Sequence, residues 1–252
     1  MFKKQGAAHW ITRGLAMVLA GVVCGWAGAE PPAIEDDRYT IGELLHEEDF
    51  TENMARWRPE LQEGGTVEVS GGMLHINVPR GATVWFTEKL EAPVMIVYEV
   101  TVVDEDGPND RVSDLNCFWM ATDSRNPDDL FAVERSGAFS DYDELYCYYV
   151  GYGGHTNTRN RFRRYIGEAG DRPLLPEHDF EDEDGFITPN ERMQVVLTAF
   201  DGVAQYFMDG EKQFEYEDGE FLSEGYFAFR TVNNHKRIHN LRIYRLEPAA
   251  GE

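Results

Sequence analysis

Short β-rich runs separated by turn residues recur along most of the chain, and this pattern constrains the fold more than any other feature. Ten runs rich in aromatic and β-branched residues are typical of strands: residues 72–78, 83–87, 94–103, 115–120, 145–152, 159–166, 193–200, 204–208, 225–231 and 238–246. Gly-Gly and Asp-Gly pairs lie between many of them. No window shows a helical stripe, and only residues 128–134 could form one or two turns. Many strands without alternating helices predict an all-β, two-sheet antiparallel β-sandwich of the jelly-roll type.

The first 29 residues have the pattern of a secretory signal peptide. Lys3, Lys4 and Arg13 precede an apolar run over residues 15–23, which ends near Ala29 in a small-residue cleavage pattern. The run is short for a membrane span. We therefore expect a signal peptide over residues 1–29, one jelly-roll domain over residues 30–252 and a secreted or periplasmic location. A retained membrane anchor is the alternative.

The charge balance excludes some classes of partner. The chain has 23 Lys and Arg against 46 Asp and Glu, a formal net charge of −23. Nucleic acids and anionic membranes are recognised through basic surfaces, so neither is an expected partner.

One segment reverses this balance. Residues 146–167 contain four arginines, His155, five tyrosines and two asparagines, but no Asp or Glu. Arginine binds planar anions bidentately. The segment therefore indicates a site for an anionic ligand, although surface ion pairs with the many acids would account for the same arginines.

No metal or cofactor site is evident from the sequence. Cys117 and Cys147 lie in strand-like runs, where either a disulfide or two buried thiols would fit, and no Cys/His pair has zinc spacing. The acidic stretch 179–191 fails the EF-hand template because Phe180 occupies the first ligand position. No cofactor is predicted; a structural calcium ion stays open.

Several stretches resemble the concanavalin A-like lectin/glucanase superfamily. They are the opening run 45–50 with Trp57, and the closing runs 193–210, 225–231 and 238–246. The middle of the chain resembles the secreted domain-of-unknown-function family 6250, in Phe118-Trp119-Met120 and in residues 148–154, 161–165 and 229–233. The resemblance implies a concanavalin A-like jelly roll and a carbohydrate ligand, because related domains include glucanases, alginate-type lyases and keto-glycoside-cleaving domains.

Strand alternation assigns side chains to the two faces of each strand. Phe162 and Ile166 predict a core face that also holds Arg164, which leaves Arg159, Arg161, Arg163 and Tyr165 on the open face. By the same alternation Phe227 and Phe229 point inward, and Tyr226 and Arg230 point outward. In residues 145–152 we expect Tyr146, Tyr148 and Tyr152 to face the cleft; Cys147 and Tyr149 are the alternative.

These residue types suit the cleavage of a uronic acid by β-elimination. Arg161 and Asn157 are expected to neutralise the carboxylate, His155 to take the C5 proton, and Tyr165 or Tyr148 to protonate the leaving oxygen. The expected binding residues are Asn157, Arg159, Arg163, Tyr152, Tyr226 and Arg230. The sequence thus favours a polysaccharide lyase acting on an acidic polysaccharide or oligosaccharide.

Two alternatives remain. One is a glycoside hydrolase or keto-glycoside-cleaving enzyme. The nearest match to a paired-carboxylate motif, Asp141-Tyr142-Asp143-Glu144, starts with the wrong residue and lies in a turn-like stretch, which weakens the case for a hydrolase. The other is a carbohydrate-binding module without catalysis.

Overall fold

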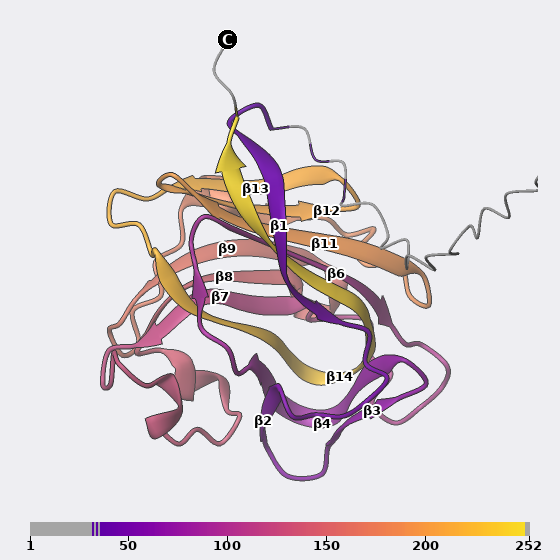
Figure 1. Cartoon of the computed structure of the whole chain (residues 1–252). Coiled ribbons are helices and arrows are strands. Elements are labelled where there is room, and N and C mark those ends of the chain that lie inside the picture. The colour runs from indigo at the N-terminus through magenta and orange to yellow at the C-terminus, as the bar shows by residue number, and fades with distance from the viewer. Residues whose placement is uncertain (1–31, 33, 35, 250–252) are drawn as a thin grey trace, which may run out of the picture. The chain divides into compact units, whose positions relative to one another are not determined.

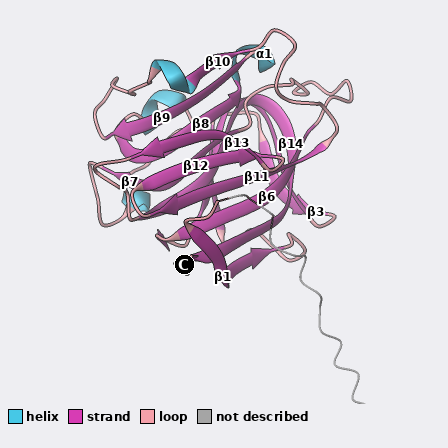
Figure 2. Cartoon of the chain, turned by 90° about the horizontal axis from the view of Figure 1, so that it is seen from above, coloured by secondary structure: helices cyan, strands magenta, loops and turns pink. Residues whose placement is uncertain are grey.

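The computed structural model describes residues 32, 34 and 36–249. The expected signal peptide lies outside the described residues and stays a prediction. Strands make up most of the described fold (Figure 2). The helical segments are single turns: η1 (Leu130–Ala132), η2 (Phe139–Tyr142), α1 (Gly154–Asn157) and η3 (Pro176–His178). Within this part of the chain, no helix has the length and apolar character needed to cross a bilayer.

The described residues form fourteen strands, and every pairing between them is antiparallel. In chain order they are β1 (Tyr39–Glu48), β2 (Trp57–Leu61), β3 (Thr66–Ser70), β4 (Met73–Phe86), β5 (Leu90–Glu91), β6 (Val94–Val102), β7 (Asn116–Asp123), β8 (Leu145–Gly153), β9 (Arg159–Ile166), β10 (Asp179–Glu181), β11 (Arg192–Phe200), β12 (Val203–Met208), β13 (Glu211–Glu217) and β14 (Glu224–Pro248).

The strands form two packed layers that the long strand β14 joins (Figure 1). The beginning of β14 pairs with β7 and β4, and its end pairs with β6 and β1. We call β10, β9, β8, β7 and the beginning of β14 the front sheet, and β13, β12, β11, β6 and the end of β14 the back sheet. This strongly curled antiparallel arrangement confirms the predicted concanavalin A-like jelly roll.

Several strand boundaries differ from the sequence prediction. Residues 225–231 and 238–246 belong to the single strand β14, and residues 73–78 and 83–86 of two predicted runs belong to β4. Strands β5 and β10 were not predicted, and neither were β2, β3 and β13. Their sequences, WRPEL, TVEVS and EKQFEYE, are rich in polar residues because much of each strand faces solvent.

Aromatic side chains fill the core between the two sheets. Phe162 of the front sheet lies 6.0 Å from Phe214 of the back sheet, and Tyr152 lies 5.7 Å from Tyr206, between ring centroids. Trp119 donates a hydrogen bond from Nε1 to the carbonyl of Thr198 at 3.2 Å. Full burial of one large apolar side chain contributes about 1.5–3 kcal/mol, so this layer dominates the stability.

The two cysteines are free buried thiols in neighbouring strands. Cys117 belongs to the core between the sheets, and Cys147 belongs to the cluster on the opposite face of the front sheet. They therefore lie on opposite faces of the sheet and are not joined.

The outer face of the front sheet is partly covered by residues 124–144, which we call the cover segment. Tyr142 of this segment packs on Phe118 with ring centroids 5.5 Å apart, and Leu130 is also buried there. Arg135 is fully buried and bridges the carboxylates of Glu60 and Asp123. An ionic network thus fastens the cover segment to the sheet.

Removing Arg135 should destabilise the fold strongly. Arg135→Ala leaves Glu60 buried without its cation, so we expect the free energy of unfolding to fall by about 3–5 kcal/mol. Denaturant unfolding followed by tryptophan fluorescence measures this change. Arg125→Ala is the matched control because Arg125 pairs with the same Asp123 from a half-buried position, and it should cost about 0–1 kcal/mol. Equal losses in the two variants would show that the buried network does not hold the cover segment.

Candidate functional site

Strand alternation places a row of polar residues across the front sheet, on the face away from the core. The register pairs Arg161 of β9 with Gly151 of β8, and Asn116 of β7 with Arg230 of β14. In the next row, Arg163 pairs with Tyr149. Residues far apart in the sequence thus meet beside the cover segment.

A cavity of about 300 Å³ lies over this row. Gly151 leaves room for the Tyr149 hydroxyl, because a Cβ atom there would meet this hydroxyl at 2.9 Å. Asn116, Phe139 and Tyr149 contribute to the lining. His155 also lines the cavity. Its charged groups are a single acid, Asp114, and five arginines, Arg159, Arg161, Arg163, Arg172 and Arg230. We call this cavity the arginine pocket.

The arginines at the mouth of the pocket already have acidic partners. Arg159 donates from Nε to Asp179 at 2.7 Å and also pairs with Glu181. Arg161 donates from Nε to the same Asp179 at 3.0 Å. Arg159 and Arg161 therefore form the ion pairs that were the alternative explanation for the arginines of this segment.

Two arginines deeper in the pocket differ. Among the described residues, neither Arg163 nor Arg230 forms an ion pair with an acid. Burial lowers the pKa of both guanidinium groups. Neither guanidinium group therefore has a carboxylate at ion-pair distance among the described residues, although Asp114 lines the same pocket.

Arg230 is the more deeply buried of the two, with 1% of its surface exposed. Its Nη1 donates to the carbonyl of Gly137 at 2.6 Å and to Thr83 at 3.2 Å. Nε and Nη2 are buried and have no hydrogen-bond partner among the described residues. Buried polar groups in native proteins are nearly always paired, so two unsatisfied donors on one buried guanidinium group are unusual.

A left-handed turn presents His155 at the mouth of the pocket. His155, Thr156 and Asn157 have φ values of 53°, 64° and 67°, which cost roughly 1–2 kcal/mol per residue. The amide of Asn157 supports the turn, since Oδ1 accepts from the Ile187 N–H at 2.8 Å and Nδ2 donates to the Ile187 carbonyl at 2.9 Å. This side chain is committed to structural hydrogen bonds, which argues against its predicted role in neutralising a carboxylate.

The exposed His155 contacts Arg161. Its Nε2 lies 3.0 Å from Nη1 of Arg161. Because a guanidinium group can only donate, Nε2 accepts this hydrogen bond and the imidazole is in its neutral form.

The predicted orientation of β8 is wrong. Tyr148 and Tyr152 face the core between the sheets, and Tyr149 faces the arginine pocket. The Tyr148 hydroxyl donates to Asp218 at 2.8 Å, and that carboxylate also accepts from Arg164. Tyr148 therefore cannot reach a ligand in the pocket.

Tyr165 and Tyr226 face away from the core as predicted, but neither lines the pocket. Tyr165 is fully buried among the aromatic residues under the cover segment, and burial raises its pKa. Tyr226 packs on Phe131, with ring centroids 4.9 Å apart. Sequence alternation placed the faces of β9 and β14 correctly but could not show the covering residues.

The carboxylate of Glu60, near the cover segment, is not free for catalysis. Glu60 accepts from Trp85 at 2.9 Å and from Tyr142 at 2.8 Å, in addition to pairing with Arg135. Within the described part of the chain, no group of three or more His, Cys, Asp or Glu residues is arranged to hold a metal ion.

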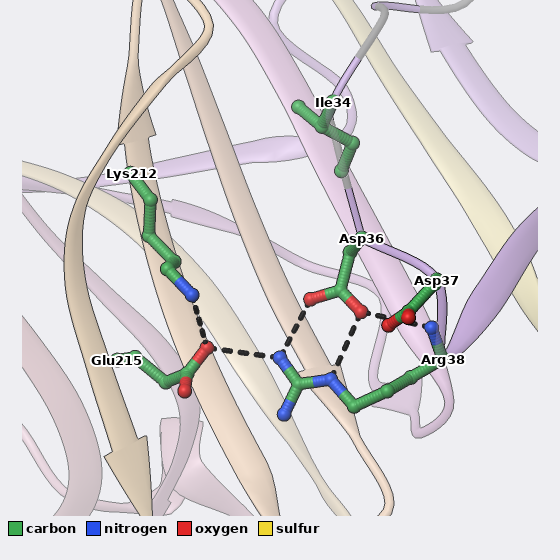
Figure 3. A pocket seen from close by; sticks show the side chains of 6 residues that line it. All are labelled: Ile34, Asp36, Asp37, Arg38, Lys212 and Glu215. Carbon is green, nitrogen blue, oxygen red and sulfur yellow. Dashed lines mark hydrogen bonds and ion pairs between the residues drawn. The ribbon is translucent and has the colours of Figure 1, made fainter.

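A second hollow lies where residues 34–38 meet the hairpin of β12 and β13 (Figure 3). There the guanidinium group of Arg38 lies between Asp36 and Glu215, and Lys212 contacts Glu215 at 2.7 Å. These charges neutralise one another, so we interpret this hollow as a structural ion-pair network.

Comparison with known proteins identifies the family. Residues 76–241 match the model described as a domain of unknown function, DUF6250. The chain belongs to the DUF6250 family. The family resemblance seen in the sequence is therefore confirmed. No curated protein matches the chain.

Solved structures share the fold at low sequence identity. A Bacillus subtilis protein of unknown function with a galectin-like fold is 14% identical, with a TM-score of 0.64 over 82% of this chain and 98% of its own. β-Agarase A from Zobellia galactanivorans is 13% identical, with a TM-score of 0.56 over 89% and 99%. The carbohydrate-binding module CBM66 from Bacillus subtilis is 12% identical, with a TM-score of 0.51 over 75% and 95%. The likeness establishes the jelly roll.

Replacing Tyr148 should affect stability and leave ligand binding unchanged. Tyr148→Phe removes a buried hydrogen bond to a carboxylate, so the free energy of unfolding should fall by about 1–3 kcal/mol. Urea unfolding measures this effect, with Tyr146→Phe at an exposed position of the same strand as the control. A folded Tyr148→Phe protein with unchanged stability would contradict the buried hydrogen bond to Asp218.

Lys236 should make the stability depend on pH. It is buried beneath Arg230, and its Nζ donates to the Arg230 carbonyl at 3.0 Å. Burial lowers the pKa of Lys236 to about 7, from an ordinary value of 10.5. Between these values the unfolded chain binds a proton that the folded chain does not, so this lysine makes the stability rise with pH.

Lys236→Met removes this contribution. From about pH 7 to pH 9.5, its free energy of unfolding should rise less steeply than that of the wild type, by up to about 1.4 kcal/mol per pH unit. Urea unfolding across this range measures both slopes. Lys212→Met, at an exposed position, should keep the wild-type slope. A Lys236→Met slope equal to the wild-type slope would show that Lys236 stays charged in the folded protein.

Proposed function

We propose that this protein binds an acidic carbohydrate and places the carboxylate of a uronic acid in the arginine pocket. The observation that carries the proposal is the pair Arg163 and Arg230, which lack acidic partners among the described residues of a chain with net charge −23. A carboxylate would accept charge-assisted hydrogen bonds from these guanidinium groups, and its negative charge would offset the cost of burying theirs.

The fold supports a carbohydrate as the ligand. Its structural neighbours include an agarase and a carbohydrate-binding module. Fold alone does not determine function, but a uronic acid combines a sugar ring for the aromatic side chains with an anion for the arginines. We also propose a location outside the cytoplasm, on the basis of the signal peptide expected over residues 1–29.

We further propose that the protein is a polysaccharide lyase. In β-elimination a base removes the C5 proton, the electron pair forms the C4–C5 double bond, and the C4–O bond breaks. The leaving oxygen then takes a proton from an acid. Hydrogen bonds to the neighbouring carboxylate make the C5 proton more acidic.

For some of these roles, residues that line the pocket fit better than the residues expected from the sequence. Arg163 and Arg230 are the neutralising residues, and neutral His155 is the base. Tyr149 is the acid, because burial raises its pKa and keeps the phenol protonated.

A non-catalytic binding module is the second candidate. The base candidate His155 is exposed at the mouth, whereas the acid candidate Tyr149 is buried, so the pocket could bind a uronate without cleaving it. A retaining or inverting hydrolase is less well supported, since Asp114 is the single acid that lines the pocket.

The lyase proposal is tested by ultraviolet absorbance of unsaturated uronates during incubation with alginate, pectins, ulvan and glycosaminoglycans. We expect a rise with at least one substrate. Arg163→Gln should lower kcat/KM by about 10- to 100-fold through lost charge-assisted hydrogen bonds. His155→Ala should abolish the rise and retain binding in calorimetry.

Arg237→Gln is the control, because Arg237 pairs with Glu105 outside the pocket. It should match the wild type. Binding without any absorbance rise would reject the lyase and leave the binding module. Absence of binding to every polysaccharide would reject the acidic-carbohydrate proposal itself.

A further inference from the structure

The arginine pocket is closed on the side of the cover segment. Phe139 lines the pocket and packs on Tyr149, with ring centroids 5.6 Å apart. Beyond it, the outer face of the front sheet is filled by a buried aromatic cluster that includes Trp85, Phe118 and Tyr142. A polysaccharide cannot lie across this part of the sheet while the cover segment is in place.

Arg172 closes a second side. Its guanidinium carbon lies 4.7 Å from the Phe139 ring centroid, and its carbonyl accepts a hydrogen bond from Arg163. Arg163 is thereby fixed to the loop that follows β9, and this loop and the cover segment meet at Phe139.

The exposure of the arginines shows which end of the pocket is open. The side chains of Arg159 and Arg161 are 25% and 24% exposed, whereas Arg230 is buried. His155 lies on the exposed side. The exposed Val232, two residues after Arg230, also lines the pocket. The pocket is therefore open at His155 and at Val232, and Arg230 is buried in its floor.

We propose that the arginine pocket is a chain-end subsite, which takes one terminal uronic acid of a glycan and holds its carboxylate at Arg230 and Arg163. This inference rests on the proposed function and specifies the mode of binding. The volume of about 300 Å³ is at the lower end of the range for small-molecule sites, which suits one sugar better than a run of several.

The test is the stoichiometry of binding to polyuronate fractions of defined length. Tetra-, octa- and hexadecasaccharides of galacturonate, mannuronate and guluronate are titrated by calorimetry against the full chain. His155→Ala replaces the wild type for any fraction that is cleaved. A chain-end site binds one protein per glycan at every length. Its affinity per mole of chains should stay constant, and its affinity per unit mass should fall roughly fourfold from the tetra- to the hexadecasaccharide.

Two controls assign the binding to the pocket. Methyl-esterified octasaccharide should not bind, because it lacks the carboxylate charge. Arg230→Met should lose binding at every length; where circular dichroism shows that it does not fold, Arg163→Gln replaces it.

The outcomes separate the two proposals. More than one protein per chain on the longer fractions would overturn the chain-end subsite and leave acidic-glycan binding intact. Binding of the wild-type protein to the methyl-esterified octasaccharide would overturn uronate recognition in this pocket. Undiminished binding of polyuronates by folded Arg230→Met, or by Arg163→Gln in its place, would do the same. No binding to any fraction would overturn both.

Discussion

The pairing of β14 with both sheets is the constraint on which the rest of the structure depends. One continuous strand hydrogen-bonds to β7 and β4 at its beginning and to β6 and β1 at its end. Arg230 lies in the first part and the buried Lys236 follows six residues later. Because the strand is locked on both sides, the Arg230 guanidinium group cannot escape to solvent without breaking the sheet. Its desolvation cost is therefore built into the fold.

The cover segment has a charge network separate from Arg230. Its Arg135 pairs with the carboxylates of Glu60 and Asp123, whereas Arg230 donates to the carbonyl of Gly137 in the same segment. The first network fastens the segment by ion pairs, and the second leaves Nε and Nη2 of Arg230 without a partner among the described residues.

The fold was predictable from the sequence because strand signals and turn signals alternate so regularly. The face of β9 was predictable too, since Phe162 and the arginines differ sharply in polarity. For β8 the same reasoning failed. Tyr148 packs in the core and Tyr149 packs under Phe139 of the cover segment, so both faces are apolar. A pattern of polar and apolar residues cannot distinguish two buried faces.

The pocket itself depended on contacts that no local pattern encodes. Arg172 follows β9 in a loop, and Phe139 belongs to a single turn. Both were missed as lining residues because only tertiary packing brings them beside Arg230. Four residues of the acid-free segment 146–167 that the sequence singled out, His155, Arg159, Arg161 and Arg163, nevertheless line the pocket.

The charge of the whole protein acts against its proposed ligand. A net charge of −23 repels an acidic glycan at long range, but salt screens exposed charges over a Debye length of about 8 Å at physiological ionic strength. Contacts with the buried Arg230 are screened much less. Salt therefore weakens the repulsion more than the attraction, which suits recognition of anions in saline surroundings. The arginines attract only at short range, and this favours a ligand whose carboxylate enters the pocket over one that merely passes the surface.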